Sequence, residues 1–216
     1  MMKEKLGILF DLDGTLLDTL DDLTDATNYT LKYFGCPERS RDEIRSFVGN
    51  GAVRQMTLAL PGRPDDPDIG EVLAVYKAYY AEHCQIKTKP YPGAVQVLKA
   101  LTDIYPTAIV SNKPDIAVKQ LCAEYFPGVY ALGESSGCPR KPAPDMLFQA
   151  MQAIGAEKGI YVGDSEVDIL TARNANMPCL TVLWGFRDRK LLEDQGGEYF
   201  CELPEEIPEM IKRMQL

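Results

Sequence analysis

The spacing of the hydrophobic positions changes along the chain. A short continuous apolar run at Leu6–Phe10 is typical of a buried strand. From residue 19 to residue 86 no convincing strand follows, and turn signals at Gly35-Cys36-Pro37 and Gly49-Asn50-Gly51 separate stretches of helical spacing. The apolar residues of these stretches are Leu20, Leu23, Leu31, Phe34, Val53, Met56, Leu60, Ile69, Val72, Leu73, Tyr76, Tyr79 and Tyr80. We expect an all-helical block of about four helices here.

From residue 91 onward, short apolar runs alternate with amphipathic stretches. The runs are Thr107–Val110, Val129–Leu132, Gly159–Val162 and Cys179–Leu183, and helical spacing precedes each of them. Short apolar strands that alternate with helices indicate a parallel sheet covered on both faces. The sequence therefore predicts an α/β fold, a doubly wound, Rossmann-like parallel-sheet core with an inserted all-helical cap subdomain. We assign residues 1–15 and 88–216 to the core and residues 16–87 to the cap.

Composition narrows the class of protein. The 216 residues are 45% apolar and 25% charged, which is ordinary for a soluble globular protein. A formal net charge of −9 argues against a general affinity for nucleic acid, although one local basic pocket could hold a small anion. The first apolar run is too short for a signal peptide or a membrane span. We expect a cytoplasmic protein with no nucleic-acid or membrane partner, and the oligomeric state stays open.

Scarce residue types exclude several catalytic chemistries. The six cysteines form no C-x-x-C pair, and we interpret them as reduced thiols. His83 is the only histidine, which argues against a histidine-based zinc site and against a Ser-His or Cys-His catalytic pair. Carboxylates and lysines must therefore carry the chemistry.

Polar residues of these types follow the apolar strands. They are Asp11 and Asp13 after the first strand, Ser111, Asn112 and Lys113 after the next, Lys141 in a later loop, and Asp164 and Asp168 after Gly159–Val162. Ligands bind outside the carboxyl ends of parallel strands, so these side chains are expected to line one pocket. Crowded carboxylates repel one another, and Mg²⁺, which binds few carboxylates and substrate phosphate, would remove that repulsion.

Each piece also has a simpler interpretation when it is read alone. Asp13-Gly14 could form a turn, and Asp164 with Asp168 could cap a helix. Ser111 could be an ordinary cap, or it could bind phosphate at the start of the helix that Pro114 opens.

The order of these motifs resembles the haloacid dehalogenase-like hydrolase superfamily. The resemblance rests on Asp11-Leu12-Asp13-Gly14-Thr15, followed by Ser111, Lys141, and Gly163-Asp164 with Asp168. A helical insert directly after the first motif is similar to the helical-cap subgroup. Haloacid dehalogenases of this superfamily do not need the second aspartate, so the presence of Asp13 favours phosphate chemistry.

The resemblance implies a role for each matching residue. Asp11 would be the nucleophile that forms an aspartyl-phosphate, and Asp13 the general acid and then the general base. Mg²⁺ would be held by the Asp11 carboxylate, the Asp13 backbone carbonyl and Asp164. Ser111, Lys141 and the backbone at Asn112 would bind the phosphoryl oxygens, and Asp168 would support the metal or Lys141.

The segment Phe47–Ala52 is similar to the cap segment of phosphoglycolate phosphatases. Gly49, Asn50 and Gly51 at a helix start, with Arg54 one turn in, could hold a substrate carboxylate, or the segment could be a plain turn. The expected substrate is a small phosphorylated carboxylic acid such as 2-phosphoglycolate. Pyrophosphatase, nucleotide or sugar-phosphate phosphatase and β-phosphoglucomutase-like activities are the alternatives. A receiver module would not explain the first motif or the helical insert.

Overall fold

The core of the computed structural model is a six-stranded parallel sheet, and the structure describes residues 5–62, 66–135 and 137–214. The strands are β1 (Leu6–Phe10), β4 (Thr107–Pro114), β5 (Tyr130–Glu134), β6 (Lys158–Gly163), β7 (Cys179–Val182) and β8 (Tyr199–Cys201). Their order across the sheet is β5-β4-β1-β6-β7-β8, and every neighbouring pair is parallel. The predicted doubly wound α/β core is therefore confirmed.

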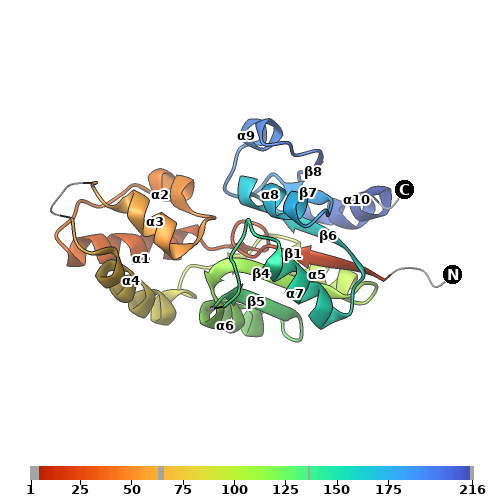
Figure 1. The fold of residues 1–216 in the computed structure, drawn as a ribbon, viewed down its shortest axis with the longest axis horizontal. Helices are drawn as coiled ribbons and strands as arrows, with labels where there is room; N and C mark the ends of the chain where they lie inside the picture. Colours follow the sequence, from red (N-terminus) through yellow and green to blue (C-terminus); the bar gives the residue numbers. More distant parts are fainter. Residues whose placement is uncertain (1–4, 63–65, 136, 215–216) are drawn as a thin grey trace.

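Helices cover both faces of this sheet (Figure 1). They are α5 (Ala94–Thr102), α6 (Asp115–Tyr125), α7 (Asp145–Ile154), α8 (Glu166–Asn174) and α10 (Ile207–Met214). The short helix α9 (Arg189–Asp194) contacts α8, and a short 3₁₀ turn lies at Pro204–Glu206. In β1, Ile8 and Phe10 pack in one apolar cluster with residues of α5, α6 and α10, while Leu9 packs in another with residues of α7 and α8. Burial on both faces explains why β1 is a continuous apolar run.

A separate group of four helices forms the predicted cap, at the left of Figure 1. The helices are α1 (Leu20–Tyr33), α2 (Arg41–Phe47), α3 (Gly51–Ala59) and α4 (Ile69–His83). They share their own hydrophobic cluster, which includes the core residue Phe186. The chain enters and leaves the cap through a two-stranded antiparallel sheet, β2 (Leu17–Asp18) and β3 (Lys89–Pro90), which the sequence pattern did not predict.

The structure corrects two details of the sequence interpretation. The predicted periodicity of the third helical stretch placed Val53 on the apolar face, but its side chain is 39% exposed. The buried face of α3 is formed instead by Ala52, Gln55, Met56 and Ala59. The last strand β8 and the helices α9 and α10 were also not predicted.

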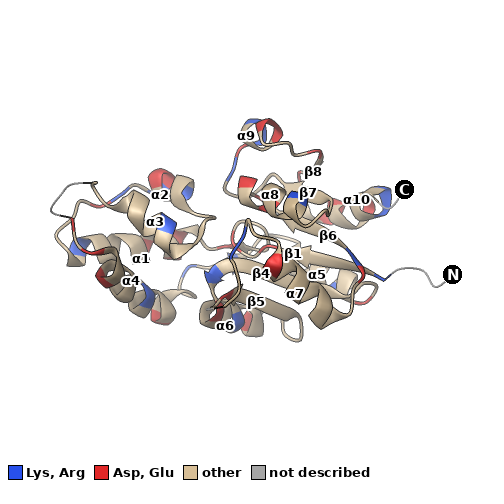
Figure 2. Ribbon diagram, in the orientation of Figure 1, with Lys and Arg blue, Asp and Glu red and all other residues tan. Residues whose placement is uncertain are grey.

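Charged residues of both signs are interspersed on the helices of the cap and the core (Figure 2). Within the described part of the chain, no helix combines the length and the apolar character needed to cross a membrane. The boundaries at residues 16 and 87, the cytoplasmic location and the lack of a nucleic-acid partner stay predictions.

Candidate functional site

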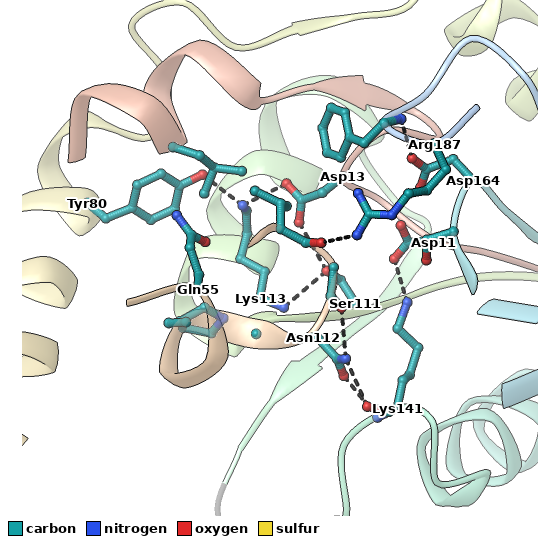
Figure 3. A pocket seen from close by; sticks show the side chains of 18 of the residues that line it. Asp11, Asp13, Gln55, Tyr80, Ser111, Asn112, Lys113, Lys141, Asp164 and Arg187 are labelled. Carbon is teal, nitrogen blue, oxygen red and sulfur yellow. Dashed lines mark hydrogen bonds and ion pairs between the residues drawn. The ribbon is translucent and has the colours of Figure 1, made fainter. Parts of the chain in front are cut away.

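One pocket lies between the carboxyl ends of the strands and the cap (Figure 3). Asp11 and Asp13 follow β1, Ser111 and Asn112 lie in the second half of β4, and Asp164 directly follows β6. Because β4, β1 and β6 are neighbours in the sheet, these side chains meet at one edge. Lys141 reaches the same place from the loop before α7. The structure thus brings the predicted core residues together.

Lys141 is held by three partners inside the protein. Its Nζ lies 2.6 Å from Oδ1 of Asp11, 2.8 Å from Oδ1 of Asp168 and 2.8 Å from the hydroxyl of Tyr161. Burial acts to lower the pKa of Lys141, but the carboxylates of Asp11 and Asp168 outweigh it, so the pKa lies above its ordinary value. The ammonium therefore stays charged beside the predicted nucleophile.

Asp168 contacts both the start of α8 and Lys141. Its Oδ2 accepts hydrogen bonds from the backbone N–H and the hydroxyl of Ser165, at 3.1 and 2.6 Å, at the start of α8. Its Oδ1 accepts from Lys141 and from the hydroxyl of Tyr161. Because both oxygens have protein partners, Asp168 caps the helix and holds Lys141 at the same time.

The carboxylates of Asp11 and Asp164 fit a divalent cation. One oxygen each of Asp11, Asp164 and Asp168 lies within 4.8 Å of the others, and all three side chains are buried. Burial, with repulsion from Asp168, raises the pKa of Asp164 to about 7. Burial also raises the pKa of Asp11, despite the charge of Lys141. Mg²⁺ prefers such oxygen donors and would offset the penalty of burying these charges.

Close packing around Asp164 explains the Asp-Gly pair of the first motif. Gly14 has a φ of +89°, and a Cβ at this position would collide with the Asp164 carboxylate. The Oδ2 of Asp164 accepts a 2.6 Å hydrogen bond from the backbone N–H of Phe186. The hydroxyl of Thr15 approaches the other oxygen at 3.4 Å. The motif therefore does more than form a turn, because it holds a buried carboxylate at the end of β6.

Asp13 points away from this acidic cluster and has a different set of partners. Its Oδ1 lies 2.7 Å from Nζ of Lys113 and accepts a 2.6 Å hydrogen bond from the hydroxyl of Thr19. Its Oδ2 accepts from the hydroxyl of Ser111 at 3.2 Å. The two aspartates of the motif are therefore in different environments, Asp11 beside Lys141 and Asp13 beside Lys113.

Asn112 connects three parts of the site through its side chain. Its Oδ1 accepts from the backbone N–H of Lys141 at 2.9 Å, and its Nδ2 donates to the carbonyl of Lys141 at 3.0 Å. The same Nδ2 donates to the cap carbonyl of Gly49 at 3.2 Å. The sequence suggested only a backbone role for Asn112, and the position of its amide could not be predicted from a motif.

The four predicted cap residues differ in whether they line the pocket. Gly49 and Gly51 line the pocket, whereas Asn50 and Arg54 are not among the described residues that line it. Arg54 is exposed on α3, and its neighbour Gln55 is buried and lines the pocket. The helical phase that misplaced Val53 also explains the outward position of Arg54.

Arg187 is a pocket residue that sequence reasoning missed. It follows β7 and makes a two-point ion pair with Glu166, at 2.7 and 3.2 Å. It also donates to the carbonyls of Arg45 and Val48 in the cap, at 2.9 and 2.7 Å. The signal that could have found it is its place after an apolar strand, at the sheet edge that carries the other site residues.

Comparison with known proteins agrees with this geometry. The profile of the family described as haloacid dehalogenase-like hydrolase matches residues 8–182. Phosphoglycolate phosphatase 1 of Pseudomonas aeruginosa is 33% identical over 200 residues, which are 88% of this chain and 73% of that protein. The phosphoglycolate phosphatase of Rhodobacter capsulatus is 33% identical over 194 residues, 86% of this chain and 87% of that protein.

Solved structures are similar over nearly the whole chain. A Lactobacillus delbrueckii protein, provisionally named a phosphoglycolate phosphatase, shares 38% identity and a TM-score of 0.86, covering 97% of this chain and 99% of that one. A haloacid dehalogenase-like family hydrolase from Streptococcus pneumoniae shares 26% identity and a TM-score of 0.85, covering 96% and 98%. The chain belongs to the haloacid dehalogenase-like hydrolase family, and it is a hydrolase similar to phosphoglycolate phosphatases.

Proposed function

We propose that the protein is a Mg²⁺-dependent phosphomonoester hydrolase that acts through an aspartyl-phosphate on Asp11. The observation that carries the proposal is the 2.6 Å contact between Lys141 and Oδ1 of Asp11 in a buried site. Lys141 fixes the carboxylate and leaves Oδ2 as the oxygen that attacks phosphorus. Ser111, Lys141 and the backbone at Asn112 bind the phosphoryl oxygens.

Bound Mg²⁺ supplies positive charge that offsets the charge of the phosphoryl group beside the nucleophile. Asp11 and Asp164 would hold it through their carboxylates, which lie close together. The family resemblance implies the Asp13 backbone carbonyl as a further ligand. Asp168 supports the site by fixing Lys141.

Asp13 handles the proton in both half-reactions. When Asp11 displaces the leaving group, Asp13 gives its proton to the departing oxygen. Asp13 then takes a proton from water, whose oxygen attacks phosphorus and breaks the bond to Asp11. The products are an alcohol and inorganic phosphate, and both carboxyl groups return to their starting states. Asp13 lies apart from the acidic cluster and on the cap side of the pocket, where the leaving group of the substrate would be.

For the substrate we propose a small phosphorylated carboxylic acid such as 2-phosphoglycolate. Two features support this choice: the similarity to proteins named phosphoglycolate phosphatases, and the cap that covers the pocket. Gly49 and Gly51 would approach the part of the substrate beyond the phosphate. The contribution of Asn50 to substrate binding stays a prediction, and the exposed position of Arg54 does not support a contact of that residue with the substrate.

The test is steady-state kcat/KM with Mg²⁺ against phosphoglycolate, pyrophosphate, nucleoside monophosphates and hexose phosphates. We expect phosphoglycolate to give the highest value, with phosphate released many times over the enzyme concentration. A higher kcat/KM for another of these compounds would overturn the proposed substrate but leave the proposed phosphatase activity standing. Conversion of a hexose phosphate to its isomer without phosphate release would instead identify a mutase.

A further inference from the structure

Three cationic side chains are among the described residues that line the pocket, and protein partners take up most of the hydrogen-bonding capacity of two of them. Lys141 has three protein partners for its three ammonium protons, and the proton that it gives to a phosphoryl oxygen in the proposed mechanism must come from one of these contacts. Arg187 uses four of its five N–H groups on Glu166 and on the two cap carbonyls. Neither side chain has much capacity left for a second anion on the substrate.

Lys113 is the third cation, and it lies where the core meets the cap. Its Nζ is 2.7 Å from Oδ1 of Asp13 and donates to the hydroxyl of Tyr80, on α4, at 2.7 Å. The ammonium is also 4.7 Å from the centre of the Tyr80 ring, and the side chain is 3% exposed. Figure 3 shows it between Asp13 and Tyr80. Among the described residues, its recorded polar contacts use two of the three protons.

We infer that Lys113 binds the substrate carboxylate and sets the preference for phosphorylated acids; this inference rests on the proposed function. In phosphoglycolate the carboxylate is one carbon from the leaving oxygen. Asp13 must meet that oxygen, so the carboxylate lies within reach of the cation beside Asp13. The third ammonium proton completes a charge-assisted hydrogen bond to it.

The surroundings of Lys113 make this charge important. The pocket wall beside it is formed by Tyr76, Tyr80 and Leu23 of the cap, all buried. An anion that enters such a site loses water and needs a nearby cation in exchange. Tyr80 positions that cation by accepting a hydrogen bond from Nζ on the cap side of the pocket. A neutral substrate of the same shape would gain much less from Lys113.

The test compares phosphoglycolate with its neutral carboxamide, phosphoglycolamide, in the wild type and in Lys113→Met. The readout is the ratio of the two kcat/KM values. The variant also removes the ion-pair partner of Asp13, but that loss is common to both substrates and cancels in the ratio. We expect the wild type to prefer the acid and the ratio to fall about ten- to a hundredfold in Lys113→Met. Lys113→Arg, which keeps the charge, should restore part of the preference.

Lys119→Met is the matched control, because Lys119 is an exposed lysine of α6 paired with Asp115. It should leave the ratio unchanged. An unchanged ratio in Lys113→Met, with both rates reduced, would overturn the inference and make Lys113 a positioning residue for Asp13. A wild type that does not prefer the acid would overturn the proposed substrate class and this inference together. An inactive but folded Lys113→Met that Lys113→Arg does not rescue would also contradict carboxylate recognition.

Discussion

Core side chains contact other core side chains on one side of the pocket and contact the cap on the other. On the phosphate side, charged side chains contact one another directly, as Lys141 does with Asp11 and Asp168. On the cap side, core side chains reach backbone carbonyls and a tyrosine: Asn112 reaches Gly49, Arg187 reaches Arg45 and Val48, and Lys113 reaches Tyr80. The phosphate side is a fixed charge network that would meet the same phosphoryl group in every phosphate ester. The cap side is a contact between two parts of the chain, and it meets the variable part of the substrate.

The largest effect is expected at the nucleophile. Asp11→Asn keeps the shape of the side chain and removes the attacking charge, so turnover should fall by several orders of magnitude on every substrate. Phosphate release and circular dichroism, measured on the same sample, check activity and fold together. Near-normal turnover by the folded variant would exclude the covalent mechanism.

Removal of Mg²⁺ should also stop turnover on every substrate. Ca²⁺ should replace it poorly, because its larger and more flexible coordination shell misplaces nucleophile and phosphate. Binding has a readout without turnover: Mg²⁺ should raise the melting temperature of the wild type, and Asp164→Asn should weaken that rise. Full activity after exhaustive chelation would contradict the proposed roles of Asp11 and Asp164.

Asp168→Asn tests whether the phosphate side acts as one network. The amide oxygen can still cap α8, but the charge that holds Lys141 is lost. We expect kcat/KM to fall about tenfold to a hundredfold, by the same factor for phosphoglycolate and for an aryl phosphate. Different factors for the two substrates would show that this residue also affects the cap side.

The same difference explains how far the sequence could predict the molecule. Asp11 and Asp164 directly follow β1 and β6, and Ser111 follows the apolar run of β4. The parallel sheet fixes their meeting point whatever surrounds them. Strand alternation likewise predicted the core, because burial on both faces leaves a clear apolar run. The elements that the sequence did not predict have weak sequence signals, such as the two-residue strands β2 and β3 and the late strand β8.

The cap side could not be predicted in the same way. Carbonyl groups of Arg45, Val48 and Gly49 belong to every residue type, so no sequence motif marks them. The partner of Lys113 is a hydroxyl 33 residues earlier in the chain, on a helix whose orientation depends on packing. A one-residue error in the predicted helical phase was enough to assign the pocket position of Gln55 to Arg54.

That exchange gives the smallest and most specific prediction. Gln55 donates to the hydroxyl of Thr27 at 2.8 Å and lines the pocket together with Tyr76, which stacks on Tyr80. Gln55→Leu should therefore lower kcat/KM for phosphoglycolate about three- to tenfold, in line with one lost hydrogen bond, and affect an aryl phosphate less. Arg54→Ala, an exposed change on the next residue, should stay within about twofold on both substrates. Steady-state kinetics of the two variants, with melting temperatures as a control for folding, make the comparison. A larger, substrate-dependent loss in Arg54→Ala than in Gln55→Leu would support the helical phase that the sequence suggested. It would then indicate that residues at the start of α3 recognise the substrate.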